Sequence, residues 1–137
     1  MINQTDRDLL EVFTAFVRLW LRSLAQSDWT GACAMLDEAN THGLRWTPSA
    51  LQDLIAGTFG PGTRFAAQHP EGPRVCSPED VATPHPPLEL IAYNDGSGYT
   101  LDHDFPLNGT WSDLTARFEF LRKPDGFAVV LHDLHVL

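Results

Sequence analysis

The sequence SDLTARFEFLRKPDGFAVVLHDLHVL, residues 112–137, contains two apolar runs joined by a Lys-Pro-Asp-Gly turn. From Leu114 to Phe120, apolar residues alternate with polar ones, which is the period of a strand with one buried face. Two such runs separated by a turn that contains proline and glycine are typical of a β-hairpin. We therefore predict an antiparallel hairpin over residues 112–137.

The same period of two begins at residue 88 and predicts a meander of antiparallel strands. Turns that contain asparagine, aspartate, proline or glycine separate the strands, which we place over residues 88–93, 99–107, 113–122 and 127–137. Alternation assigns these residues to the face that helices should cover: Tyr99, Leu101, His103, Phe105, Leu107, Leu114, Ala116, Phe118 and Phe120.

The last predicted strand carries apolar residues on both faces. Phe127, Val129 and Leu131 share one face, whereas the other is largely filled by Ala128, Val130, Leu134 and Val136. A strand that is apolar on both faces lies centrally in a curved sheet or contributes its outer face to a dimer. We therefore predict homodimerisation through the sheet.

The part of the chain before residue 60 has the period of helices instead. Large apolar residues recur there three or four positions apart, which predicts helices over residues 5–26, 28–39 and 48–59. Ser27 and Asp28 can cap the second helix, and Thr47 followed by Pro48 starts the third. Helices followed by strands predict an α+β fold, in which three N-terminal helices pack on a curved antiparallel sheet of four to five strands.

Residues 60–87 connect the helices to the strands and contain seven of the ten prolines. Proline removes a backbone donor, so we expect no long regular element in this connection. Within it we predict a short strand over residues 63–68 and one helical turn at residues 77–80. The connection is either a lid or partner-binding loop, or simply a proline-stiffened crossover from helices to sheet.

A length of 137 residues, of which 43% are hydrophobic, predicts one domain over residues 1–137. Arg18 and Arg22 interrupt the longest apolar stretch, and the first residues lack the pattern of a signal peptide, so we expect neither a membrane span nor export. Cys33 and Cys76 lie far apart and outside any CxxC motif, which favours neither a disulfide framework nor a cysteine metal site. These features predict a cytoplasmic protein.

The formal net charge of −9 is concentrated in the middle of the chain. No lysine or arginine occurs between Arg74 and Arg117. That interval contains seven acidic residues: Glu79, Asp80, Glu89, Asp95, Asp102, Asp104 and Asp113. Such a surface repels nucleic acid and attracts a basic protein, although a merely solubilising surface is the simpler interpretation.

The order of helices and strands, with Ser-Asp-Trp at residues 27–29 opening the second helix, resembles the nuclear transport factor 2-like (cystatin-like) cone. The segments WSDLTA, residues 111–116, and HDLHVL, residues 132–137, look like parts of small bacterial proteins of uncharacterised function. Relatives of this fold include isomerases, dehydratases, epoxide hydrolases, polyketide cyclases, scaffolds and immunity proteins. The resemblance therefore implies a shape and does not select an activity.

His103 is the candidate for chemistry. If it faces the interior of a cone, it could act as a general base, with Tyr93 or Tyr99 in the same cavity; the simpler interpretation is a hydrogen-bonded core or rim histidine. His132 and His135 stand three apart on a strand, so we expect them on opposite faces and predict no metal site.

Two functions remain open, and we favour the first. One is a non-catalytic binding protein, such as an immunity-type inhibitor of a basic protein partner. Its expected contact residues are Glu79, Asp80, Asp95, Asp102, Asp104 and Trp111. The alternative is a small-molecule-binding protein or an enzyme of the isomerase, dehydratase or hydrolase type, with His103 in the cavity. Neither function calls for a cofactor.

Overall fold

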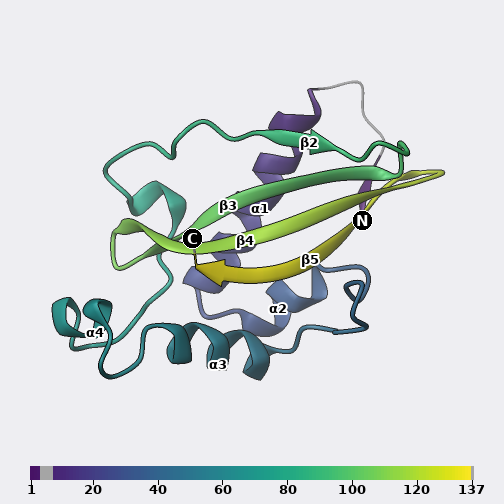
Figure 1. Cartoon of the computed structure of the whole chain (residues 1–137). Helices are drawn as coiled ribbons and strands as arrows, with labels where there is room; N and C mark the ends of the chain where they lie inside the picture. Colours follow the sequence, from purple (N-terminus) through teal and green to yellow (C-terminus); the bar gives the residue numbers. More distant parts are fainter. Residues whose placement is uncertain (4–7, 137) are drawn as a thin grey trace.

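The computed structural model describes residues 1–3 and 8–136 and shows an α+β fold with one antiparallel sheet (Figure 1). The sheet has five strands in the order β1-β5-β4-β3-β2. The strands are β1 (Ile2–Asn3), β2 (Leu90–Ala92), β3 (Gly98–Leu107), β4 (Thr110–Lys123) and β5 (Gly126–Val136). The helices are α1 (Leu9–Ala25), α2 (Trp29–Ala34), α3 (Pro48–Thr58), α4 (Arg64–Gln68) and the short 3-10 helix η1 (Pro78–Asp80).

The predicted hairpin is confirmed as β4 and β5. The two strands pair antiparallel, with Phe120 opposite Val129. Gly126 follows the turn with φ 155°, and a Cβ atom there would lie 2.0 Å from the carbonyl oxygen of Ile2. Glycine is therefore required at this position, because β1 approaches the start of β5 too closely for any side chain.

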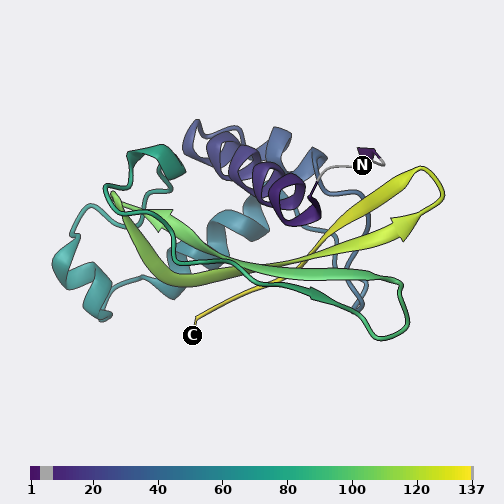
Figure 2. The same cartoon turned by 90° about the horizontal axis from the view of Figure 1, so that it is seen from above.

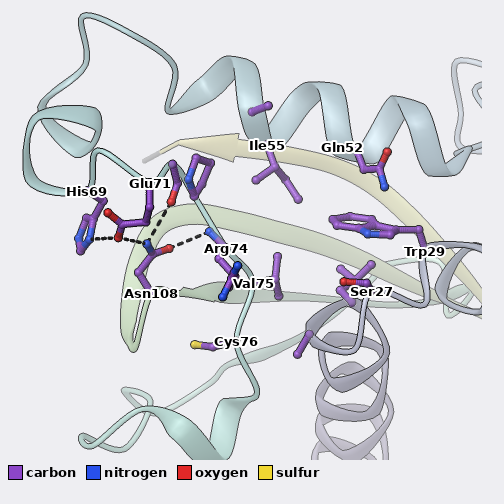
Figure 3. A pocket seen from close by; sticks show the side chains of 15 residues that line it. Ser27, Trp29, Gln52, Ile55, His69, Glu71, Arg74, Val75, Cys76 and Asn108 are labelled. Atoms are coloured by element: carbon purple, nitrogen blue, oxygen red, sulfur yellow. Dashed lines mark hydrogen bonds and ion pairs between the residues drawn. The ribbon is translucent and has the colours of Figure 1, made fainter.

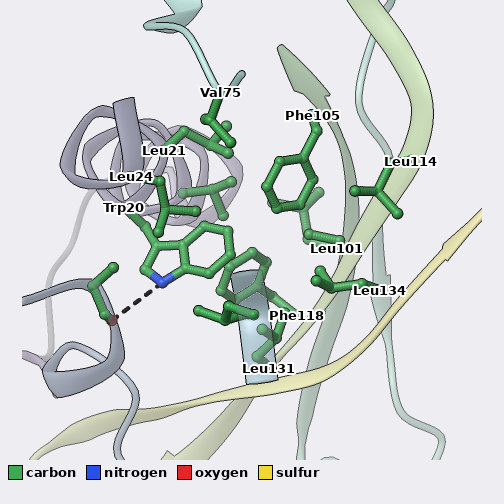
Figure 4. Close-up of a cluster of buried hydrophobic side chains, with 14 of the residues drawn as sticks. Trp20, Leu21, Leu24, Val75, Leu101, Phe105, Leu114, Phe118, Leu131 and Leu134 are labelled. Carbon is green, nitrogen blue, oxygen red and sulfur yellow. Dashed lines mark hydrogen bonds between the residues drawn. The ribbon is translucent and has the colours of Figure 1, made fainter. Parts of the chain in front are cut away.

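The core lies between the sheet and α1, which covers one face of it (Figure 2). The ring of Phe13 stacks on Phe120 with centroids 4.0 Å apart. Trp20 packs edge-on against Phe105 and Phe118, at 5.7 and 5.1 Å (Figure 4). Aromatic rings thus fill the space between helix and sheet, as the alternation of β4 predicts. We call the opposite side of the sheet its outer face.

The second helix is shorter than predicted, because α2 ends at Ala34 rather than near residue 39. The chain then leaves the helix to cover the free edge of β5. The backbone N–H of Asp37 donates to the carbonyl of Val129, and its carboxylate accepts from the N–H of Val129 at 2.7 Å. The side chain of Asn40 and the indole of Trp46 donate to carbonyls further along the same strand. This segment forms hydrogen bonds with backbone groups at the edge of β5, which could otherwise pair with another strand.

Strand β5 is buried on both faces over residues 127–131, as predicted. Further along the strand the prediction is wrong, because Leu134, expected on the same face as Ala128, joins the core and Val136 is 51% exposed. Ala128 and Val130, on the outer face, are 2% and 1% exposed within a single chain. A second copy is therefore not required to cover them, and homodimerisation stays a prediction.

The connection over residues 60–87 contains a helix where we predicted a strand. Residues 64–68 form α4, because the Thr63 hydroxyl caps it by accepting from the N–H of Ala66. The ring of Phe65 packs against Phe59 at 4.7 Å and anchors α4 to the end of α3. The predicted helical turn at residues 77–80 is confirmed as η1.

The described helices include none with the length and apolar character needed to cross a membrane. The first predicted helix, residues 5–26, is α1, and its predicted residues 5–7 lie outside the described residues.

Candidate functional site

The histidines of β5 lie together, whereas we predicted them on opposite faces. A bulge interrupts the register after Arg117 and adds one residue to β5. The extra residue reverses the alternation, so both imidazoles reach Asp133. His135 Nδ1 lies 2.7 Å and His132 Nε2 lies 3.8 Å from its carboxylate oxygens.

The predicted acidic contact residues are divided among three places. Asp102 and Asp104 share the outer face of β3, where Asp102 forms a two-pronged ion pair with Arg117 and raises the pKa of that guanidinium. Asp95 accepts from the N–H of Ser97 in the turn between β2 and β3. Glu79 and Asp80 belong to η1, beside α1.

A pocket of about 480 Å³ lies between α1 and the segment 78–88. We call it the His103 pocket. Three α1 residues spaced four apart, Leu10, Thr14 and Arg18, form one wall. The other walls comprise Pro78, Glu79, Val81, Thr83, Pro84, His85, Pro86, Pro87, Leu88, His103 and Trp111.

His103 faces the helices, as predicted, and is only 1% exposed. Its Nδ1 lies 2.8 Å from the carbonyl oxygen of Asp104. A carbonyl can only accept, so the Nδ1 carries the proton and the Nε2 carries a lone pair. That Nε2 finds no hydrogen-bond partner among the residues that the structure describes. Burial, with smaller contributions from the nearby His85 and Arg18, lowers the pKa of His103 from 6.5 to about 4, although the hydrogen bond to the Asp104 carbonyl acts in the opposite direction.

Two aromatic side chains cover His103. The ring of His85 lies over it with centroids 4.3 Å apart, and Trp111 meets both imidazoles nearly edge-on. Because His85 Nδ1 donates to the carbonyl of Pro86, its Nε2 accepts from the N–H of Asp104 at 3.2 Å. The indole of Trp111 donates to the carbonyl of Thr83. Hydrogen bonds thus attach the residues 83–86 to the sheet beside the pocket.

Two arginines of α1 and the carboxylate of Glu79 form a cluster of charged side chains beside the His103 pocket. Arg22 Nε donates to Glu79 Oε1 at 2.8 Å, and Arg18 Nη2 lies 3.7 Å from the same oxygen. The Ser77 hydroxyl donates to the other carboxylate oxygen. Chiefly because of the hydrogen bonds from Arg22 and Ser77, the pKa of Glu79 falls to about 2.

Neither predicted tyrosine joins His103. The hydroxyl of Tyr93 donates to Glu119 on the outer face, and burial together with this carboxylate raises the pKa of Tyr93. Tyr99 lies four residues from His103 along β3, packed against Phe13 and Phe127. His103 therefore has no tyrosine as a catalytic partner.

A larger cleft of about 940 Å³ lies between α3 and the segment 69–76 (Figure 3). Its polar side chains bind one another. The amide of Asn108 donates to Glu71 and accepts from the N–H of Arg74, and Glu71 also lies 3.3 Å from the imidazole of His69. These groups hold the turn after β3 in place, so we take the His103 pocket as the candidate site despite its smaller volume.

We predicted His103 and Trp111 as site residues from the sequence, but not His85 or Arg18. The four-residue spacing of Leu10, Thr14 and Arg18 was a usable signal, because it places a cation in line with a hydroxyl on one helix face. No comparable signal identifies His85, which lies among prolines.

Within the described residues, no cluster of three or more histidine, cysteine or acidic side chains is arranged to hold a metal ion. In comparisons with known proteins, no family model, no curated protein and no solved structure matches this chain.

Proposed function

We propose that this protein binds a small ligand in the His103 pocket and acts as a binding protein rather than as a catalyst. The observation that carries this proposal is the buried, unpaired Nε2 of His103. Leaving a buried acceptor unpaired costs roughly 1–3 kcal/mol, which a ligand with an O–H or N–H group would offset. A pocket of about 480 Å³ also has the size of small-molecule sites.

The low pKa of His103 argues against proton transfer. An imidazole with a pKa of about 4 is neutral near pH 7 and a weak base there. It can still accept a hydrogen bond. Because the Nε2 is almost fully enclosed, a ligand would reach it only after the ring of His85 or Trp111 moves aside.

A fragment screen followed by NMR tests this function. We expect alcohols and amides to shift the indole N–H signal of Trp111 and to lose about tenfold in affinity in His103→Phe, the equivalent of one lost hydrogen bond. Fragments without a donor should bind both proteins equally. His135→Phe is the control, since His135 contacts Asp133 on the outer face. Failure of every fragment to shift Trp111, or equal affinities in His103→Phe, would contradict the proposal.

The outer face favours a second candidate function, an immunity-type inhibitor of a basic protein. Asp102, Asp104, Glu119 and Asp133 surround Arg117 there. The side chains of Asp102 and Asp133 are 40% and 43% exposed, so a cationic partner could approach them. Complementary charge would speed and orient such an encounter.

Binding of the basic protein cytochrome c at low salt tests this surface. We expect the triple variant Asp102→Asn, Asp104→Asn, Asp133→Asn to bind at least about tenfold more weakly than the wild type. A control with the same net charge replaces the exposed acids Glu11, Asp53 and Asp125 by their amides. Equal losses in both triple variants would mean that only net charge matters and would rule out a specific outer-face site.

We also propose that the fold is the nuclear transport factor 2-like cone. Helices on one face of a five-stranded antiparallel sheet support this assignment. In a cone of this kind the His103 pocket would open at the boundary between α1 and the sheet. Since that fold hosts many functions, the ligand must be inferred from the residues of the pocket itself.

A further inference from the structure

We infer that the ligand of the His103 pocket is a small carboxylic acid that also carries a hydroxyl or amino group. This inference rests on the proposed function and names its ligand class. It depends on three features of the pocket: the guanidinium of Arg18, the acceptor of His103 that has no partner among the described residues, and apolar walls.

The arginines belong to one row of α1. Leu10, Thr14, Arg18 and Arg22 are spaced four residues apart and so lie on the same side of the helix, which faces η1 and the prolines after it. An apolar residue, a hydroxyl and the guanidinium of Arg18 thus follow one another along the wall of the pocket, and Arg22 continues the row beyond it, at Glu79.

Arg22 already binds a carboxylate, that of Glu79, and Arg18 lies beside the same group. Arg22 holds it through two nitrogens, whereas Arg18 lies at 3.7 Å, beyond hydrogen-bond distance. Arg18 lines the pocket, and among the described residues its guanidinium forms no hydrogen bond, so its donors can pair with another acceptor. The planar guanidinium matches a carboxylate, so an acid is the anion that this site is built to receive.

His103 supplies the second recognition group. Its Nε2 can accept a hydrogen bond but cannot donate one in the tautomer that the Asp104 carbonyl selects. It would therefore pair with a ligand hydroxyl or amine and not with the ligand's carboxylate. The ring of His85 or that of Trp111 must move away from His103 for this contact to form.

The remaining walls are mostly apolar. Leu10, Val81, Leu88 and Trp111 line the pocket together with four prolines. They would cover the hydrocarbon part of an acid whose carboxylate reaches Arg18 and whose hydroxyl reaches His103. Mandelate carries a carboxylate and a hydroxyl on one carbon beside a phenyl ring, and it serves as the probe.

Glu79 competes with the ligand in this scheme. It presents its carboxylate to both arginines from the mouth of the pocket. The ligand must share or displace it. We therefore expect Glu79→Gln to tighten binding of mandelate severalfold, because the amide leaves the arginines free for the ligand.

Three matched probes test the inference: mandelate, its amide mandelamide, and the corresponding diol 1-phenyl-1,2-ethanediol. We expect the wild type to bind mandelate at least about tenfold more tightly than the other two, followed by the indole N–H signal of Trp111. Arg18→Gln should abolish this preference while the diol binds unchanged. Arg45→Gln, which removes a charge from an exposed side chain outside the pocket, is the control.

The outcomes separate the two proposals. If the amide and diol bind as tightly as mandelate, or if Arg18→Gln keeps the preference, the ligand is not selected as an acid, and the ligand-binding function still stands. Phenylacetate, which lacks the hydroxyl, should bind the wild type about tenfold more weakly than mandelate does. In His103→Phe, phenylacetate and mandelate should bind with equal affinity. If no probe shifts Trp111 in the wild type, and the fragment screen is also negative, both proposals fail.

Discussion

Replacing Trp20 by alanine should lower the free energy of unfolding by about 3–5 kcal/mol. Trp20 is 0% exposed and packs edge-on against Phe105 and Phe118 (Figure 4). Its indole N–H also donates to the carbonyl of Ala32 and so ties α1 to α2. The substitution leaves a large cavity, because rings held by two strands cannot collapse into the space, and it removes one of the two hydrogen bonds that the Ala32 carbonyl accepts.

Urea unfolding measured by circular dichroism checks this prediction. The control is Leu19→Ala, one residue earlier on the same helix, whose side chain is 52% exposed and should cost less than about 0.5 kcal/mol. A loss below about 1 kcal/mol for Trp20→Ala, or the same loss in both variants, would mean that the interface between α1 and the sheet is not the main source of stability.

The sheet could be predicted closely from the sequence because alternation reports burial directly. Phe118 and Phe120 are both 0% exposed, and they face α1 as the pattern requires. The pattern failed at one place, the bulge beside Arg117, where one extra residue changes the phase of β5. No local signal marks that bulge, so the grouping of His132 and His135 around Asp133 could not be foreseen.

The helix ends were harder to predict because they depend on distant partners. The sequence after Ala34 still has helical character, but Asp37 leaves the helix to pair with Val129, 92 residues away. The helix over residues 64–68, by contrast, is marked by a residue next to it. Thr63 caps α4 in the way that Thr47 caps α3, and the short length of the segment concealed it.

The candidate site joins parts of the chain that no spacing rule connects. His103 comes from β3, Arg18 from α1, and His85 and Glu79 from the proline-rich connection. By its sequence, that connection is either a lid or partner-binding loop, or a crossover from helices to sheet. In the structure its residues form a wall of the His103 pocket, and its prolines keep it extended across the sheet edge.

Lowering the pH from about 7.5 to about 5 should remove about 2 kcal/mol of stability through His103 alone. The pKa of this histidine is about 4 in the folded protein, against 6.5 for an unperturbed imidazole. Between these values the unfolded chain binds a proton that the folded chain excludes, so protonation favours unfolding as the pH falls. Above pH 6.5 both states are neutral at this site and the effect disappears. The cause is the burial of an imidazole whose Nε2 has no partner with which to share a proton.

Urea unfolding of the wild type and of His103→Phe at both pH values measures the effect, since the difference between the two losses isolates His103 from the other titrating groups. We expect the variant to lose about 2 kcal/mol less than the wild type. His42→Gln, which alters an exposed histidine, should keep the full pH dependence and serves as the control. If the wild type and His103→Phe lose the same free energy, His103 is already protonated or paired in the folded protein. A ligand could then gain nothing by donating to its Nε2, and the proposed binding function would lose its main support.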